Sequence, residues 1–332
     1  MKICLISFDY FNFDSYIIAE LKRRGIETCQ IDISKYEYNY KYPLEKTKNF
    51  FSKLLFNANI KKIKMEEFVL KKLCEIGKQD IILVIRPDRI TKKTHIEIKK
   101  NTDKYIAYIY DSCNRFPINH LKKDIFDTIF SFDINDCKKF GFQHLSNYIY
   151  LEKKELKQPV DFKTNLFIIS SIDERLPLLN KLANYCTNNK IKINFIIVGK
   201  KKPINLNNQI VYTNKNIFFD DLKLNLEEAK IFLDLVRKGQ NGLSFRIFEA
   251  LSYQRKIITS NQSIKEYDFY NPNNILVIDE KQFSIPKSFL DTPYEPLSET
   301  IYEKYTIKNW VNIVFKKIER QNHLLLPQSE VI

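Results

Sequence analysis

One segment in the second half of the chain constrains the fold more than any other. The short apolar run Ile231–Leu235 is typical of a buried strand, and Gly239 and Gly242 interrupt it. A helical pattern follows over 244–254, and a second apolar run occupies 256–260. A strand, a tight loop, a helix and a further strand in this order predict one half of a parallel α/β sheet.

The same alternation of apolar runs and amphipathic helical patterns extends along the whole chain. The expected strands are 2–8, 27–33, 81–85, 105–110, 128–132, 165–170, 193–198, 209–212, 231–235, 256–260 and 274–278. A length of 332 residues suits two domains of ordinary size. We therefore predict an α/β fold with two Rossmann-like domains, 1–155 and 156–306, whose parallel sheets are flanked by helices. The charged segment 151–164 would link them, and a helix over 307–320 and a tail over 321–332 would follow.

Parallel α/β sheets bind ligands at the carboxyl ends of their strands, where helix N-termini present free amide groups to anions. In the helix over 244–254, the apolar residues share one side, which we expect to face the core. Arg246, Glu249 and Tyr253 share the opposite side. They form either a solvated face with an ion pair or a ligand-binding face, and the spacing alone favours the solvated face.

The motif Gln-x-Gly-Leu-Ser-x-Arg-x-Phe-Glu-Ala-Leu at 240–251, followed by Tyr-Asp-Phe-Tyr-Asn-Pro at 267–272, resembles a known family. It is similar to GT-B glycosyltransferases of bacterial lipopolysaccharide and capsule biosynthesis. Many GT-B members carry a Glu-x7-Glu motif whose second Glu holds the donor ribose. Glu249 matches that second Glu, whereas the first falls on Asn241. This departure leaves open whether the reaction retains or inverts configuration.

The resemblance implies a metal-independent transferase that moves a sugar from a nucleotide-sugar donor to a glycan or lipid-linked saccharide acceptor. The first domain would bind the acceptor and the second the donor, and the C-terminal helix would cross back onto the first domain. Arginines and backbone amides would neutralise the phosphate of the leaving nucleotide, which requires no metal. The predicted donor-binding residues are Ser171, Arg175, Gln240, Gly242, Leu243, Ser244, Arg246 and Glu249.

The turn Ser171–Arg175 precedes a helical pattern that extends to about Asn188. Ser171 and Arg175 would bind a phosphate, or Ser171 or Asp173 would cap the helix and leave Arg175 on the surface. The residues by themselves favour neither interpretation. The resemblance favours the phosphate, because similar enzymes carry a comparable turn at this place.

An inverting transfer needs a general base beside the acceptor hydroxyl. Three expected strands of the first domain end in an acidic segment, namely Arg86-Pro87-Asp88, Asp111-Ser112 and Asp133. We predict Asp111 as the catalytic residue, with Asp9 and Asp88 as rivals. Asp133 is expected to cap the following helix instead.

The formal net charge of the chain is +14. This charge reflects either solvated lysine faces or attraction to anionic lipid headgroups and phosphate-bearing substrates. Residues 46–76 show a basic, amphipathic helical pattern, which makes them the candidate for contact with an anionic membrane surface. The alternative, favoured by the sequence, is that their apolar side packs on the sheet. No nucleic-acid-binding motif is present, so a nucleic-acid partner is not expected.

Motifs of several other classes are missing from the sequence. It contains no G-x-G-x-x-G, no P-loop, no C-x-x-C and no Asp-x-Asp, and its four histidines are scattered. We therefore expect neither a cofactor nor a metal. No signal-peptide pattern and no apolar run of ~18 residues is present, which predicts a cytoplasmic protein, free or peripheral at the inner face of the plasma membrane.

Two other functions compete with sugar transfer. One is a non-catalytic nucleotide- or carbohydrate-binding protein on the same fold, to which Asn241 gives some weight. The other, less favoured, is a basic nucleic-acid-binding protein, which would show strongly salt-dependent binding.

Overall fold

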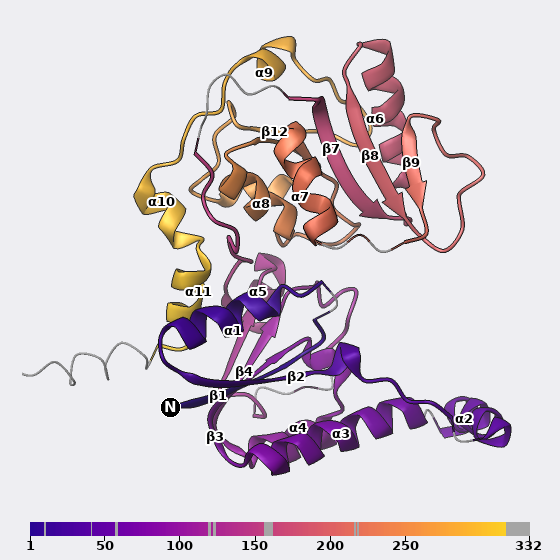
Figure 1. The fold of residues 1–332 in the computed structure, drawn as a ribbon, viewed down its shortest axis with the longest axis vertical. Coiled ribbons are helices and arrows are strands. Elements are labelled where there is room, and N and C mark those ends of the chain that lie inside the picture. The colour runs from indigo at the N-terminus through magenta and orange to yellow at the C-terminus, as the bar shows by residue number, and fades with distance from the viewer. Residues whose placement is uncertain are drawn as a thin grey trace, which may run out of the picture. The chain divides into compact units, whose positions relative to one another are not determined.

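The computed structural model describes residues 1–9, 11–40, 42–56, 59–118, 121, 124–155, 162–215, 217 and 219–316. The chain divides into two compact units between Leu145 and Ser146. Each unit contains a parallel sheet with helices on its faces (Figure 1). The predicted α/β class with two Rossmann-like sheets is confirmed. Of the predicted linker 151–164, residues 156–161 lie outside the described residues.

Unit 1 contains six parallel strands in the order β2-β1-β3-β4-β5-β6. Their bounds are β1 (Lys2–Ser7), β2 (Glu27–Asp32), β3 (Gln79–Ile85), β4 (Thr102–Ile109), β5 (Thr128–Ser131) and β6 (Gln143–His144). The central strands are continuous apolar runs because helices cover both faces of the sheet. The strand order reverses between β1 and β3, which is where a doubly wound sheet opens a ligand crevice.

The helices of unit 1 differ in how they pack. Their bounds are α1 (Asp14–Arg23), η1 (Ile33–Lys35), α2 (Pro43–Phe56), α3 (Ile60–Ile76), η2 (Pro87–Arg89), α4 (Lys92–Lys99) and α5 (Ile134–Phe140). α3 buries Val69 and Leu73 in the core that includes the sheet, as the sequence favours. α2 departs from that expectation, because Phe50 and Phe51 are exposed.

The start of α1 is capped differently from the sequence pattern, which predicts Asp14 as the N-cap. Asp14 is the first helical residue, and the N-cap position belongs to Phe13. The capping acceptor is Asp9, whose Oδ2 accepts a hydrogen bond from the Asp14 amide at 3.0 Å. Asp133, by contrast, caps α5 as predicted and accepts from the amides of Asn135 and Asp136.

Unit 2 contains six parallel strands in the order β12-β11-β10-β7-β8-β9. Their bounds are β7 (Thr164–Ser171), β8 (Ile193–Val198), β9 (Ile210–Thr213), β10 (Ala229–Asp234), β11 (Lys256–Thr259) and β12 (Ile275–Val277). Numbered from the start of the unit, this is the strand order of a dinucleotide-binding sheet, whose ligand crevice lies where the order reverses. In unit 2 that point lies between β7 and β10.

Helices cover both faces of the second sheet and form two apolar cores. Their bounds are α6 (Leu176–Asn188), α7 (Phe219–Glu228), α8 (Phe245–Tyr253), η3 (Gln262–Glu266), α9 (Lys287–Asp291), α10 (Glu299–Lys304) and α11 (Ile307–Val314). α8 contributes Leu251 and Ile247 to one core, as predicted. α6 contributes Leu179 and Leu182 to the other.

The C-terminal helix is shorter than the sequence predicts. α11 begins at Ile307 but ends at Val314, and the predicted tail 321–332 lies outside the described residues. The Ile307 amide donates a hydrogen bond to the Ile149 carbonyl at 2.9 Å. The described contacts of α11 therefore include the first segment of unit 2, and its crossing onto the first domain stays a prediction.

Candidate functional site

Two arginines meet one carboxylate at the reversal point of the second sheet. Arg175 binds Asp173 through two hydrogen bonds, Nε to Oδ1 at 2.8 Å and Nη2 to Oδ2 at 2.7 Å. Arg237 Nη2 lies 3.0 Å from the same Oδ2. Arg175 Nη1 also donates to the Leu235 carbonyl at 2.9 Å, so its side chain connects the segments that follow β7 and β10.

This cluster has an excess of positive charge. Burial alone would raise the pKa of Asp173, but hydrogen bonds from Arg175 and the charge of Arg237 outweigh it and lower that pKa. One carboxylate thus stays ionised between two guanidinium groups. The remaining positive charge lies where the exposed Ser171 ends β7, which suits an anionic ligand such as a phosphate.

The end of β8 comes close to the turn after β7 because of a glycine. A Cβ atom added to Gly199 would lie 2.5 Å from Ile172 Cδ1, closer than packed side chains allow. The Ile172 amide donates a hydrogen bond to the Val198 carbonyl at 3.1 Å. Gly199 therefore allows the turn that carries Asp173 and Arg175 to pack against β8.

The loop between β10 and α8 is held by side chains at the ends of β10 and β11. Ser244 Oγ donates to Asp234 Oδ1 at 2.7 Å, and Thr259 Oγ1 donates to Asp234 Oδ2 at 2.9 Å. Asn261 Nδ2 donates to the Asn241 carbonyl at 3.0 Å. Ser244 occupies the N-cap position of α8 without capping it, since its hydroxyl is directed to Asp234. Gly242 and Leu243 are buried in this loop, and Gln240 is half-buried.

Glu249 is buried and Arg246 is only partly exposed, so the pair is not the solvated face that the spacing alone favours. Glu249 is 3% exposed, and its Oε2 lies 2.6 Å from Arg246 Nη1. The Tyr150 hydroxyl donates to Glu249 Oε1 at 2.5 Å. The Arg246 guanidinium also lies 5.2 Å from the centre of the Phe167 ring on β7. The predicted contact of this pair with a donor stays a prediction.

A second cluster lies at the ends of β3 and β4 in unit 1. Arg86 adopts the left-handed conformation with φ 63°, and its guanidinium forms two 2.8 Å hydrogen bonds with Asp88. The same guanidinium lies 3.9 Å from the centre of the Phe116 ring, and that of Arg115 lies 4.8 Å from it. A non-glycine residue at positive φ is uncommon, and here the two bonds to Asp88 hold it.

The three candidate bases have different surroundings at this edge. Asp111 Oδ2 lies 3.3 Å from Arg115 Nη1 and 3.7 Å from Arg86 Nη1. Asp88 is bound by Arg86 on both oxygens. Asp9 faces no arginine in the described contacts, and burial together with the charge of Asp32 raises its pKa.

A buried histidine supports the β3 end. His95 Nε2 lies 2.9 Å from the Pro87 carbonyl, which can only accept, so Nε2 carries the proton. The imidazole thereby holds the η2 turn, which carries Asp88 and Arg89.

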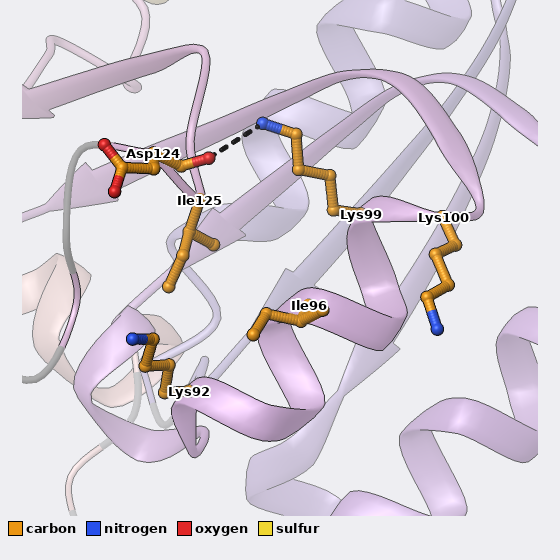
Figure 2. A pocket seen from close by; sticks show the side chains of 6 residues that line it. All are labelled: Lys92, Ile96, Lys99, Lys100, Asp124 and Ile125. Atoms are coloured by element: carbon orange, nitrogen blue, oxygen red, sulfur yellow. Dashed lines mark hydrogen bonds between the residues drawn. The ribbon is translucent and has the colours of Figure 1, made fainter.

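A surface hollow of about 430 Å³ lies elsewhere on unit 1 (Figure 2). It is lined by Lys92, Ile96, Lys99, Lys100, Asp124 and Ile125. The Lys99 ammonium donates to the Asp124 carbonyl at 3.2 Å across it. Its lining comes from α4 and from the segment before the amino end of β5, and it includes no predicted site residue. Strand topology and chemistry, rather than this hollow, therefore define the candidate site.

Among the described residues, no group of three or more His, Cys, Asp or Glu side chains could hold a metal ion. In the same part of the chain, no helix is long and apolar enough to cross a membrane.

Comparison with known proteins gives a match in structure only. No protein-family model and no curated protein matches the chain. The UDP-forming trehalose-phosphate synthase from Burkholderia xenovorans superposes with a TM-score of 0.58 at 9% identity, over 96% of this chain and 100% of that one. The UDP-GlcNAc 2-epimerase of Methanocaldococcus jannaschii, in complex with UDP-GlcNAc and UDP, superposes with a TM-score of 0.52 at 14% identity. The match covers 95% of this chain and 100% of the epimerase chain.

The chain has a GT-B fold. At these identities the similarity establishes the architecture and not the activity.

Within this GT-B fold, the predicted donor residues fall into two groups. Ser171 and Arg175 lie at the reversal point of the second sheet, whereas Arg246 and Glu249 pair on α8, which follows the loop that carries Gln240, Gly242, Leu243 and Ser244. Sequence reasoning missed Arg237, which completes the first group, and Tyr150, which holds the second. The sequence around each of these residues does not indicate its role, because the role depends on a partner that is distant in sequence.

Proposed function

We propose that this protein transfers a sugar from a nucleotide-sugar donor to a glycan or lipid-linked saccharide acceptor in bacterial lipopolysaccharide or capsule biosynthesis. The observation that carries the proposal is the Arg175–Asp173–Arg237 cluster at the reversal point of a dinucleotide-type sheet. That sheet also carries the 240–251 motif that resembles donor-binding segments. The protein would act in the cytoplasm, where nucleotide sugars are the donors.

Unit 2 would hold the nucleotide with its phosphates toward Arg175 and Arg237. Negative charge develops on the phosphate as the glycosidic bond breaks. Two guanidinium groups fixed by Asp173 would stabilise that charge without reorganising, and this role needs no metal. The amides near Gly242 and Ser244, held by the β10–α8 loop contacts, would add donors to the same end of the sheet.

Glu249 would accept hydrogen bonds from the donor ribose. Its buried carboxylate is held from two sides by Tyr150 and Arg246, so its position is determined before ligand binding. Because Glu249 is 3% exposed, ribose binding requires the side chains above it to move. The proposal thus includes a local rearrangement around α8 when the donor binds.

Unit 1 would bind the acceptor at the ends of β1, β3 and β4. Arg86, Arg89 and Arg115 surround Phe116 there, so the acceptor would present hydroxyls or an anionic group to guanidinium donors. For an inverting transfer, Asp111 is the proposed base, and Asp9 is its strongest rival because its pKa is raised. Measuring kcat for Asp111→Asn and for Asp9→Asn shows which of the two carboxylates is the base.

The test of the proposed function is turnover of nucleotide sugars by the purified full chain. Release of the nucleotide from UDP-, GDP-, ADP-, dTDP- or CMP-sugars is measured with and without saccharide acceptors. We expect one donor to be consumed, and Glu249→Ala to reduce its turnover by about a hundredfold or more. A Glu249→Ala variant with unchanged donor affinity and turnover would refute the assignment of that residue.

The second candidate is a non-catalytic nucleotide- or carbohydrate-binding protein. Asn241 favours it, since the first Glu of the full motif is absent at that position. Nucleotide binding at unit 2 with no consumption of any of the five donor classes would support this alternative over transfer.

A further inference from the structure

Helix α2 is amphipathic, and its apolar side faces away from the protein. Leu44 is 67% exposed, Phe50 is 64% exposed and Phe51 is 56% exposed. Leu44, Thr47 and Phe51 follow the i, i+3, i+7 spacing of one helix face, and Phe50 borders it. The two phenyl rings contact each other edge to face at 5.7 Å. A soluble helix normally turns such a face toward the core.

The side of α2 that faces the protein is polar and hydrogen-bonded. Asn49 is 4% exposed, and its Nδ2 donates to the Tyr40 hydroxyl at 2.8 Å. Its Oδ1 accepts from the Ile60 amide, also at 2.8 Å, and so links α2 to the start of α3. Glu45 accepts a hydrogen bond from the Tyr38 hydroxyl at 2.5 Å. Since Glu45 and Asn49 are one turn apart, these contacts fix the rotation of α2 about its axis.

The flanks of the exposed face are basic. At about 100° per residue, Lys46 and Lys48 project on opposite sides of the face formed by Leu44, Phe50 and Phe51. Both lysines are exposed, and neither forms an ion pair with another described residue. Figure 1 shows α2 at the end of α3, beyond the sheet of unit 1. Apolar side chains thus project outward between two exposed positive charges.

We propose that α2 binds the surface of an anionic lipid bilayer. The phenyl rings and Leu44 would enter the boundary between headgroups and acyl chains. Lys46 and Lys48 would reach the phosphates along its edges, because lysine can extend its ammonium group away from an apolar surface. A protein partner would satisfy the apolar side chains equally well, but the flanking lysines select a surface that carries negative charge on both sides of the helix.

The experiment is flotation of the full chain with vesicles of phosphatidylglycerol and phosphatidylcholine in equal parts, with pure phosphatidylcholine vesicles in parallel. Binding is expected to anionic vesicles, to weaken at high salt and to be much weaker on neutral vesicles. Phe50→Ser with Phe51→Ser should reduce the partition coefficient by about 10- to 100-fold. Lys46→Glu with Lys48→Glu should reduce it by at least about tenfold.

Matched variants on unit 2 provide the controls. Ile204→Ser removes an exposed apolar side chain, and Lys281→Glu with Lys287→Glu makes the same change in net charge. Both should bind vesicles as the unaltered chain does. The exposed sites of all these changes should leave the thermal unfolding midpoint within a few degrees of the unaltered value.

Three outcomes would overturn the proposal. One is absence of binding to anionic vesicles at low salt, and another is binding that the α2 variants and the unit 2 variants reduce equally. The third is a change of oligomeric state in Phe50→Ser with Phe51→Ser without vesicle binding by the unaltered chain, which would assign α2 to a contact between copies. Flotation needs no donor, so its result is separate from the outcome for sugar transfer.

Discussion

The Tyr150 hydroxyl donates a 2.5 Å hydrogen bond to Glu249 Oε1 although the two residues are 99 positions apart in sequence. The bond joins the first segment of unit 2 to α8, and both side chains are buried. Together with Arg246 it determines where the proposed ribose-binding carboxylate lies. Removing the hydrogen-bond donor of this buried carboxylate therefore measures how much the bond contributes to the free energy of unfolding.

Tyr150→Phe should lower the free energy of unfolding by about 1–3 kcal/mol, since it leaves a buried carboxylate oxygen without its donor. Urea denaturation measures the change. Tyr270→Phe is the matched control, because the Tyr270 hydroxyl has no hydrogen-bond partner recorded among the described residues and should change stability little. Equal stability of Tyr150→Phe and the unaltered chain would contradict the proposed bond.

Asp173→Asn should destabilise the chain by about 1–3 kcal/mol at neutral pH, because it removes the charge that pairs Arg175 and Arg237. The pKa of Asp173 is lowered, so its contribution is present above the ordinary value of 3.8 and is lost as pH falls through the lowered pKa. The difference in the free energy of unfolding between Asp173→Asn and the unaltered chain should therefore disappear at acidic pH. Asp103→Asn, which breaks an exposed pair with Lys78, should change little at any pH.

Asp14→Asn tests a carboxyl group whose pKa is raised by the fold rather than lowered. Burial, with the charge of Asp9, raises the pKa of Asp14 well above 3.8. A raised pKa means that the folded chain binds this proton more tightly, so stability declines as pH rises through the raised value. Asp14→Asn should remove that decline. The variant should therefore become more stable relative to the unaltered chain as pH rises. Parallel stability profiles in urea titrations between acid and neutral pH would show that Asp14 is ionised when folded.

Gly199→Ala should destabilise unit 2 by about 1–3 kcal/mol, because the new methyl group would lie 2.5 Å from Ile172 Cδ1. Ile172→Ala removes the atoms that clash. The double variant should therefore lose less stability than the sum of the two single changes. Strict additivity in thermal or urea unfolding would rule out this contact as the reason for the glycine.

The sequence predicts the strands well because each is a short apolar run bounded by polar residues or glycine. β10, α8 and β11 lie where the 231–260 pattern places them. The helix ends are less predictable. Asp14 has the composition of an N-cap, but the capping oxygen belongs to Asp9, five residues earlier, and only the folded loop brings it to the amide.

The site is only partly readable from the sequence for the same reason. Arg175 lies in a recognisable turn, but Arg237 acquires its role through Asp173, on another strand end. The orientation of α2 likewise cannot be predicted from the sequence. Periodicity shows that the helix has an apolar face, whereas the contacts of Asn49 determine that this face points outward.

The central claim, that the reversal point of the second sheet binds a nucleotide, is tested most directly by thermal shift with UDP, GDP, ADP, dTDP and CMP. The panel is run on the unaltered chain, on Arg175→Ala and on Arg115→Ala, the last of which changes the unit 1 cluster. Because binding stabilises by mass action, one nucleotide should raise the unfolding midpoint of the unaltered chain and of Arg115→Ala, but not of Arg175→Ala. No shift with any nucleotide, or an equal shift in Arg175→Ala, would contradict the claim.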